Sequence, residues 1–284
     1  MNHNHQEQWT SIIQPSNGWF DIKFKEIWNY RDLIVMMVKR DFVAFYKQTI
    51  LGPLWYLLQP LFTTIVFTVI FGQIAKLPTN GLPQVLFYLS GTVMWNYFAA
   101  CLNTTSNTFV ANAAIFGKVY FPRLVIPIAV VITNMLSFGI QFLLFLSILL
   151  FFIYQGAVPI PNLWILVTPL LLLQMGCLGL GCGIIVSSMT TKYRDLSLLI
   201  TFGVQLWMYA TPVAYPVSMV SGLMRWVLIV NPMTAIIEIF RYAFLGGELI
   251  PLWYWGISGT MTVILLMISI VLFSKVEKNF MDTV

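Results

Sequence analysis

Side chains that could act as nucleophiles, bases or metal ligands are few in this sequence and lie far apart. The two histidines, His3 and His5, stand in a polar N-terminal stretch of the kind that is usually disordered, and metal binding there is a minor alternative. Cys101, Cys177 and Cys182 lie in apolar runs without C-x-x-C spacing, so we interpret them as packing residues. No phosphate loop, H-E-x-x-H helix or Ser, His and Asp triad is present. The sequence therefore predicts no catalytic site, no metal, no bound cofactor and no hydrolysis of ATP by this chain.

The composition is typical of a polytopic membrane protein. Hydrophobic residues make up 59% of the 284 residues and charged residues only 9%, against about 25% charged in soluble proteins. The formal net charge of +5 does not indicate a nucleic-acid partner, because the basic residues are scattered singly between apolar runs. Proton-driven transporters usually carry ionisable groups inside their spans. These spans have almost none, so we expect the energy to come from a partner.

In chain order, a polar tail without a secretory signal (residues 1–20) precedes an amphipathic segment (residues 21–48). Its apolar residues recur at helical spacing among basic ones, which predicts an interfacial helix on the cytoplasmic surface, with Asp32 and Asp41 as local charge partners. A soluble core helix is the alternative. An all-α transmembrane domain (residues 49–274) and a cytoplasmic tail (residues 275–284) follow. The six predicted spans are residues 53–71, 84–110, 124–154, 163–189, 196–210 and 252–273.

The distribution of basic residues predicts the orientation. With both termini in the cytoplasm, all but three of the 15 Lys and Arg residues lie inside, as the positive-inside rule requires. The exceptions are Lys76, Arg225 and Arg241. Residues 211–249 are then external, yet they combine prolines and charges with many apolar residues. Irregular backbone at membrane depth must be buried in protein or line a cavity, so we expect a re-entrant pair of short helices near the outer face, with a surface-lying helix as the alternative.

Two spans carry residues that indicate close helix contacts. In the fourth span, Gly179 and Gly183 have the small-xxx-small spacing that lets two helices approach closely. Toward the far end of the second span lie several polar residues, from Asn96 to Asn107. Polar groups at membrane depth need partners, so these side chains should face protein or an aqueous path.

Four pieces of sequence, taken in order, resemble the permeases of polysaccharide-exporting ABC transporters. They are K-R-D-F-V-A-F-Y-K-Q-T-I-L-G-P-L-W-Y-L-L-Q-P at 39–60, K-V-Y-F-P-R at 118–123, K-Y-R-D at 192–195, and T-P-V-A-Y-P with N-P-M between 211 and 233. The resemblance covers the chain from residue 24 onward. It implies a homodimeric, multi-pass subunit of the bacterial inner membrane that pairs with two copies of a separate ATPase. That ATPase would bind ATP and Mg, and the substrate would be a lipid-linked polysaccharide such as O-antigen, capsule or teichoic acid.

The resemblance also implies roles for two segments. Residues 112–120 would be a coupling helix seated on the ATPase, whereas composition alone equally allows an ordinary cytoplasmic connector. Ile115, Phe116 and Tyr120 would share one side of a short helix, with Asn112 and Lys118 beside them. Residues 213–247 would match outward gate helices. The gate candidates are Pro212, Tyr215, Pro216, Asn231, Pro232, Glu238 and Arg241.

Two further sets of residues relate to a glycan substrate. Arg40, Lys47 and Arg123 could meet a lipid pyrophosphate at the inner face, with anionic lipid headgroups as their alternative partners. Aromatic rings can stack on sugars, but Trp and Tyr also form the interfacial belt of membrane proteins, which is the favoured interpretation of any single ring. The candidates for a glycan path are Trp55, Tyr56, Tyr88, Trp95, Tyr97, Trp207 and Tyr209.

Two other functions stay open from the sequence. A membrane-embedded glycan-transferring enzyme would need a positioned acid, base or metal site, commonly on a large polar loop, and the chain has no polar loop of that size. The second open function is an exporter permease for a drug or a small lipid, and the sequences Y-F-P-R and L-G-P-L-W argue against it. No motif specifies which glycan would be exported.

Overall fold

The computed structural model describes residues 24–47, 50–112, 115, 121–190 and 195–283, and every regular element in these ranges is helical. This confirms the predicted all-α membrane protein. The long elements are α2 (Arg31–Lys47), α3 (Trp55–Phe67), α4 (Gln84–Ser106), α7 (Val125–Tyr154), α8 (Thr168–Thr190), α9 (Leu196–Tyr209), α11 (Pro232–Leu245) and α12 (Leu252–Thr283). The shorter ones are α1 (Phe24–Asn29), η1 (Gly52–Leu54), η2 (Thr68–Ile74), α5 (Thr108–Ala111), η3 (Leu163–Val167), η4 (Val217–Met219) and α10 (Leu223–Val230).

Within the described residues, five segments are long and apolar enough to cross a membrane. They correspond to the predicted first, second, third, fourth and sixth spans. The predicted fifth span, residues 196–210, corresponds to α9, whose 14 residues extend only about 21 Å, against a hydrocarbon core of about 30 Å. The pair α10 and α11 passes the same test only when taken together, and it is bent by 84°.

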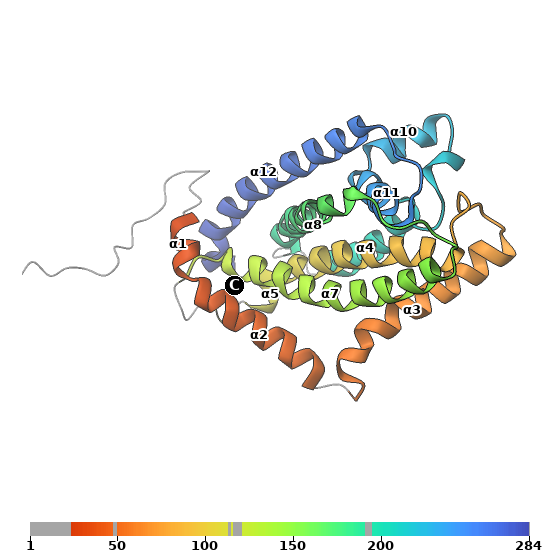
Figure 1. The fold of residues 1–284 in the computed structure, drawn as a ribbon. Coiled ribbons are helices and arrows are strands. Elements are labelled where there is room, and N and C mark those ends of the chain that lie inside the picture. Colours follow the sequence, from red (N-terminus) through yellow and green to blue (C-terminus); the bar gives the residue numbers. More distant parts are fainter. Residues whose placement is uncertain (1–23, 48–49, 113–114, 116–120, 191–194, 284) are drawn as a thin grey trace, which may run out of the picture.

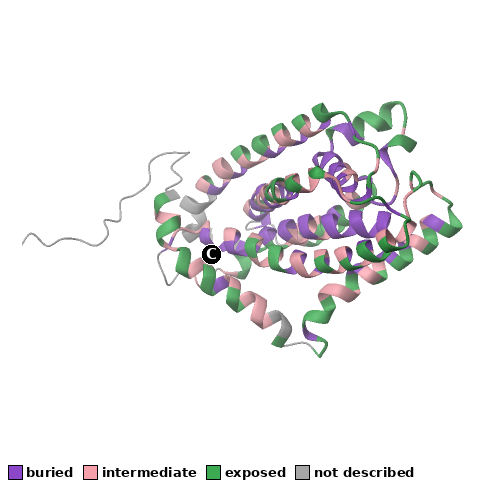
Figure 2. Cartoon of the chain, viewed as in Figure 1, coloured by how far each residue is buried: buried purple, intermediate pink, exposed green. Residues whose placement is uncertain are grey.

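Helix α4 forms the centre of the bundle. Of its apolar window 78% is buried, compared with 17% for Gly52–Ile74 and 22% for Leu252–Lys275. Figure 2 shows this contrast, with α4 largely buried and α12 mostly exposed on its outer side. In Figure 1, α4, α7 and α8 run close together, while α10 and α11 lie at the end of the bundle opposite α1 and α2.

The close contact between α4 and α8 depends on glycines. A Cβ atom added at Gly179 would lie 2.6 Å from the Cβ of Cys101, and one added at Gly183 would lie 2.5 Å from the Cβ of Thr105. Real Cβ atoms do not approach this closely, so both positions exclude a larger residue. The predicted packing role of the two glycines is confirmed, and the structure identifies α4 as the partner helix.

Some polar residues of α4 find partners on neighbouring helices, as expected, whereas the buried oxygens Asn103 Oδ1 and Thr105 Oγ1 have no hydrogen-bond partner among the described residues. Asn96 donates a hydrogen bond to Gln141 of α7 at 3.5 Å, and Thr190 at the end of α8 donates to the backbone oxygen of Ser106 at 3.1 Å. The hydroxyl of Thr64 in α3 lies 3.4 Å from that of Thr92. These bonds fix the neighbouring helices against α4.

The predicted pair of short helices between residues 211 and 249 is present as α10 and α11. Pro232 lacks the backbone N–H that a continuing helix needs, so α10 ends and α11 starts at this point. Asn231 caps α11 by accepting a hydrogen bond from the Met233 N–H at 3.1 Å. Almost all of α11 is buried, whereas α10 is mostly exposed. The alternative of a surface-lying helix therefore describes α10, whereas α11 is buried in the protein as expected for a re-entrant helix.

The N-terminal amphipathic segment is two helices, not one, because a turn at Tyr30 separates α1 from α2. Met37 of α2 is buried in a second apolar cluster with Phe121, Val125 and Phe273. On its other side, α2 exposes Val35 (65%). The predicted charge partners are confirmed, since Arg31 pairs with Asp32 and Arg40 pairs with Asp41. One face of α2 thus packs on the bundle and another is available to a membrane surface.

Replacing Gly183 or Gly179 by Leu should separate α4 from α8. Overpacking of a tight contact costs about 1–3 kcal/mol or more, and here the obstructing atoms include α4 backbone. We expect a lower melting temperature in detergent and a smaller monodisperse fraction on size-exclusion chromatography. Gly139→Ala is the matched control, because a Cβ there meets nothing within 4 Å. If the Gly183→Leu protein melted like the control, the glycines would not determine this contact.

Candidate functional site

The candidate gate residues converge on one buried side chain, Arg241. Its side chain is 2% exposed, and all five guanidinium N–H groups have acceptors. Nη1 donates to the Pro212 oxygen (2.7 Å) and to Glu238 Oε1 (3.2 Å), and Nη2 donates to the Val213 (2.7 Å) and Phe87 (3.2 Å) oxygens. Nε donates to Ser90 Oγ at 3.3 Å. One arginine on α11 therefore fixes the segment after α9 and the first turns of α4.

The surroundings of Arg241 explain how a charge is tolerated here. Glu238, one turn earlier on α11 and 12% exposed, supplies the opposite charge. The guanidinium also lies over the ring of Phe87, 3.7 Å from its centroid, which adds a favourable cation–π interaction. Buried charges are stable only when they are paired and fully hydrogen-bonded, and this arrangement meets both conditions.

Asn231 makes a second connection at the same end of the bundle. Its Nδ2 donates to the hydroxyl of Thr211 at 2.8 Å and to the backbone oxygen of Ala210 at 3.3 Å, while its side-chain oxygen caps α11. The backbone oxygen of Pro232 accepts a hydrogen bond from Ser258 of α12 at 2.6 Å. The break between α10 and α11 is thus bonded both to the end of α9 and to α12.

The other two gate candidates are less constrained. Tyr215 is half-buried and its hydroxyl donates to the Tyr209 oxygen at 3.3 Å, whereas Pro216 is buried and precedes η4. Ser218 bonds to Asn80 in the loop between η2 and α4 at 3.1 Å. The structure therefore brings all seven predicted gate residues to one end of the bundle.

The predicted docking loop lies only partly in the described residues. Phe116, Lys118 and Tyr120 fall outside them. Asn112 donates from Nδ2 to the Thr108 oxygen at 3.0 Å and ends α5. Ile115 packs against the second apolar cluster, in which Phe121 is 5% exposed. Ile115 is thus half-buried against a cluster that includes residues of α2 and α7, and whether it also contacts an ATPase stays a prediction.

The predicted inner-face cations lie on α2 and just before α7. Arg40 bonds to Asp41 from Nε at 2.7 Å, Lys47 is exposed at the end of α2, and Arg123 is half-buried just before α7. The Asp41 bond uses one of the N–H groups of Arg40, and the others stay available to a phosphate. Whether these residues meet a substrate stays a prediction.

The predicted aromatic residues divide by exposure. Tyr88 (0%), Trp95 (3%) and Tyr97 (4%) are buried in the main core, with Trp207 partly buried against Trp95. In this structure side chains of the same chain cover Tyr88, Trp95 and Tyr97, whereas Trp207 is partly accessible. The exposed members of the set are Trp55 (44%) and Tyr209 (48%), and Tyr56 is half-buried.

Sequence reasoning missed the residues of α4 that receive Arg241, namely Phe87, Ser90 and Gly91. A Cβ added at Gly91 would lie 2.8 Å from Arg241 Nη2 and 3.0 Å from the Val213 oxygen. A glycine directly after a serine inside an otherwise bulky span was an available signal of a close approach. Phe87 carried no such signal, because its contribution is a backbone oxygen and a ring face. Within the described ranges, no three His, Cys, Asp or Glu residues lie close enough to hold a metal.

Apolar spanning helices around a buried polar connection, with an amphipathic helix at the other end, define a multi-pass membrane protein. The model of the ABC-2 type transporter family matches residues 32–245, and the chain belongs to this family. It is thus a transport subunit of the membrane. Two proteins of Klebsiella pneumoniae, each called O-antigen export system permease protein RfbA, are 27% identical over 88% of this chain and 94% of their own length. A protein of the same name from Myxococcus xanthus is 26% identical over 78% of this chain and 83% of its own.

Truncation of Arg241 to Ala should destabilise the protein strongly. Breaking a buried, hydrogen-bonded ion pair typically costs about 3–5 kcal/mol, because Glu238 and three backbone oxygens lose their partner. Arg241→Lys should lose most of the same stability, since an ammonium cannot reach five acceptors arranged around a planar group. The control is Lys76→Ala at an exposed loop position, with an expected change below about 0.5 kcal/mol. Denaturation followed by tryptophan fluorescence in detergent measures both. Wild-type stability of the Arg241→Lys variant would show that a positive charge at this position is enough for stability, without the five hydrogen bonds.

Proposed function

We propose that this chain is the permease subunit of an ATP-driven exporter that moves a lipid-linked, O-antigen-like polysaccharide across the bacterial inner membrane. The observation that carries the proposal is the similarity to three O-antigen export permeases over 78–88% of the chain. The all-helical architecture and the ABC-2 family membership agree with it. No observation favours a glycan-transferring enzyme or a drug exporter as a second candidate.

The proposal places both termini in the cytoplasm. Helices α1 and α2 carry Lys25, Arg31, Lys39, Arg40 and Lys47 at one end of the bundle, and α12 runs back to the same end. At the opposite end, Arg241 is neutralised internally by Glu238, which leaves Lys76 and Arg225 as the other basic residues expected there. This charge asymmetry is the one that the positive-inside rule expects. On this orientation α9 crosses as a short fifth span and α11 lies buried beneath the outer face.

The proposed assembly contains two copies of this chain and two copies of a separate ATPase. Residues 112–120 would dock on the ATPase. Support comes from the way the loop is held, because Ile115 and Phe121 are both packed against the cluster that includes α2 and the start of α7. A loop that is packed at both ends can transmit a movement of the ATPase to the spanning helices, whereas a loose connector cannot.

Within the proposed transport cycle, the Arg241 connection would keep the outer end closed. Opening there requires movement of the Pro212–Val213 segment away from α11, and each of those two oxygens is bonded at 2.7 Å. Of the aromatic candidates, Trp55 and Tyr209 have the exposure that stacking on sugar rings needs. Tyr88, Trp95 and Tyr97 contribute to the core instead.

The function is tested by deleting the gene in its own bacterium and analysing lipid-linked glycans. Loss of the surface glycan together with accumulation of its lipid-linked form inside the cell would support export. Restoration by the wild-type gene is the control. Normal surface glycan in the deletion strain would contradict the proposal.

The purified chain should not hydrolyse ATP by itself, because its sequence contains no phosphate loop. Hydrolysis should appear only when a separate nucleotide-binding protein is present. Phosphate release is measured for the chain alone, the ATPase alone and the complex. Hydrolysis by the chain alone, above that of a mock preparation, would be inconsistent with a pure permease.

Phe116→Ala and Tyr120→Ala should weaken docking of the ATPase while leaving membrane insertion intact. Buried aromatic anchors at an interface commonly cost more than about 2 kcal/mol on truncation, which corresponds to roughly a thirtyfold loss of affinity. Co-purification of the ATPase and glycan export in cells are measured together. Lys118→Arg is the conservative control and should behave like wild type. Full co-purification and export by the double alanine variant would make residues 112–120 an ordinary connector.

A further inference from the structure

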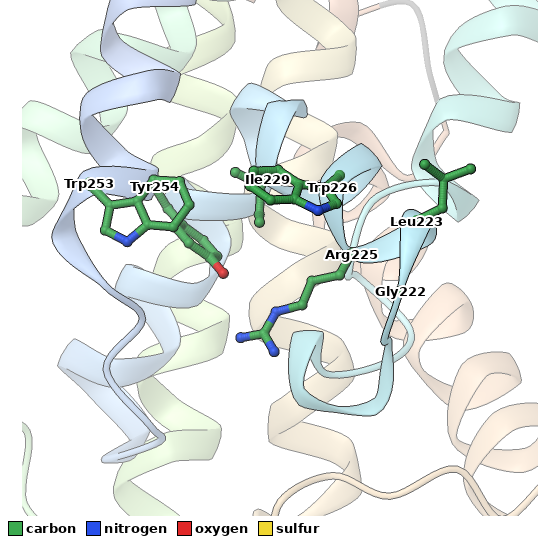
Figure 3. A pocket seen from close by; sticks show the side chains of 7 residues that line it. All are labelled: Gly222, Leu223, Arg225, Trp226, Ile229, Trp253 and Tyr254. Carbon is green, nitrogen blue, oxygen red and sulfur yellow. The ribbon is translucent and has the colours of Figure 1, made fainter.

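A cavity of about 570 Å³ lies between α10 and the start of α12, at the end of the bundle that holds α11 (Figures 1 and 3). Small-molecule sites in proteins typically enclose about 300–1,000 Å³, with mostly apolar walls and a few polar groups. This cavity falls within that range of volume and its walls are mostly apolar, but it is open to the surface. Besides Gly222, its lining consists of Leu223, Arg225, Trp226, Ile229, Trp253 and Tyr254.

Arg225 provides the cavity with an unneutralised positive charge. Among the described residues it makes no hydrogen bond and no ion pair. Arg241, on the neighbouring helix, has all five donors satisfied. No carboxylate belongs to the described lining either, and Glu238 is already paired with Arg241. The guanidinium of Arg225 is therefore available to an external anion.

The arrangement of side chains favours an anion held at one point. In Figure 3 the guanidinium of Arg225 and the hydroxyl of Tyr254 point into the same space, below Ile229 and Trp226 in this view. Tyr254 is 3% exposed, so its ring is fixed by packing. An arginine fork binds phosphate oxygens in a bidentate manner, and a tyrosine hydroxyl can donate one more hydrogen bond. The other polar side-chain groups of the described lining are the indole N–H donors of Trp226 and Trp253, and this lining has no carboxylate or amide to accept hydrogen bonds from the hydroxyl groups of a sugar.

The surface around the cavity suits a lipid. Helix α10 exposes Leu223 (82%), Met224 (68%) and Trp226 (60%), and Trp253 at the start of α12 is 51% exposed. Tryptophan and tyrosine concentrate where lipid headgroups meet acyl chains. Isolated apolar side chains at such exposure are unfavourable in water but stable against hydrocarbon. An anion bound at Arg225 would thus have apolar surface beside it for its chain.

We infer that this cavity binds the phosphate group of a lipid in the outer leaflet, with Arg225 and Tyr254 as phosphate ligands and Trp226 and Trp253 flanking the headgroup. The inference rests on the proposed function for the orientation that puts α10 outside. The shared chemistry, a phosphate on a lipid chain, is found both in phosphatidylglycerol and in a polyprenyl-phosphate carrier.

The test is native mass spectrometry of the full chain in detergent, titrated separately with phosphatidylglycerol, phosphatidylcholine, a polyprenyl phosphate and free pyrophosphate. We expect Arg225→Gln to weaken binding of the anionic lipids about tenfold, the effect of losing one charge-assisted hydrogen-bonding group. Arg225→Lys should lose less. Lys76→Gln, a loop cation not among the lining residues, is the matched control and should bind like wild type.

Each result decides. Arg225-dependent binding of phosphatidylglycerol assigns the site to a bulk lipid, and a preference for polyprenyl phosphate assigns it to a carrier; both support the inference. Equal lipid binding by wild type and Arg225→Gln overturns it, and so does Arg225-dependent binding of free pyrophosphate without lipid binding. These measurements need no export activity. Failure of the proposed function would appear only in the deletion strain, as a surface glycan that is still exported.

Discussion

A guanidinium group inside an apolar bundle must have every donor satisfied, and this requirement fixes one end of the protein. Arg241 can sit at 2% exposure only if the Pro212–Val213 backbone, Phe87, Ser90 and Glu238 are all present. Helix α11, the end of α9 and the start of α4 are therefore positioned together, not one after another. The cost of a partial arrangement, a buried charge without partners, excludes intermediate packings.

At the opposite end, α4 is held by contacts of a different kind. The smallness of Gly179 and Gly183 lets α8 approach its backbone, and Thr190 completes the contact by bonding to Ser106. One end of α4 thus relies on a network of polar bonds and the other mainly on shape. Helix contacts made by close packing tolerate small sliding movements, whereas a five-bond guanidinium cluster is either formed or broken. The difference is consistent with the proposed opening at the Arg241 end.

The sequence was most informative where one residue type has one physical meaning. Composition predicted the membrane helices, the prolines and charges of residues 211–249 predicted a pair of short helices, and the spacing of Gly179 and Gly183 predicted a tight contact. It was least informative where the partner is backbone, because the oxygens of Pro212, Val213 and Phe87 that receive Arg241 have no signature in the sequence. The same limit applies to Tyr88 and Trp95, since the sequence of a span does not show whether an aromatic ring faces a glycan path, a lipid or the protein core.

The packing of Ile115 and Phe121 on the cluster that contains Met37 has a consequence for protein engineering. The described residues of the loop after α5 and the helix α2 pack on the same apolar cluster, so each contributes to the packing of the other. Grafting the loop of a related permease onto this chain would introduce side chains that pack on a different apolar cluster. A chimaera that carries the loop of another permease would therefore need the α2 of that permease as well, although some 70 residues separate the two segments along the chain.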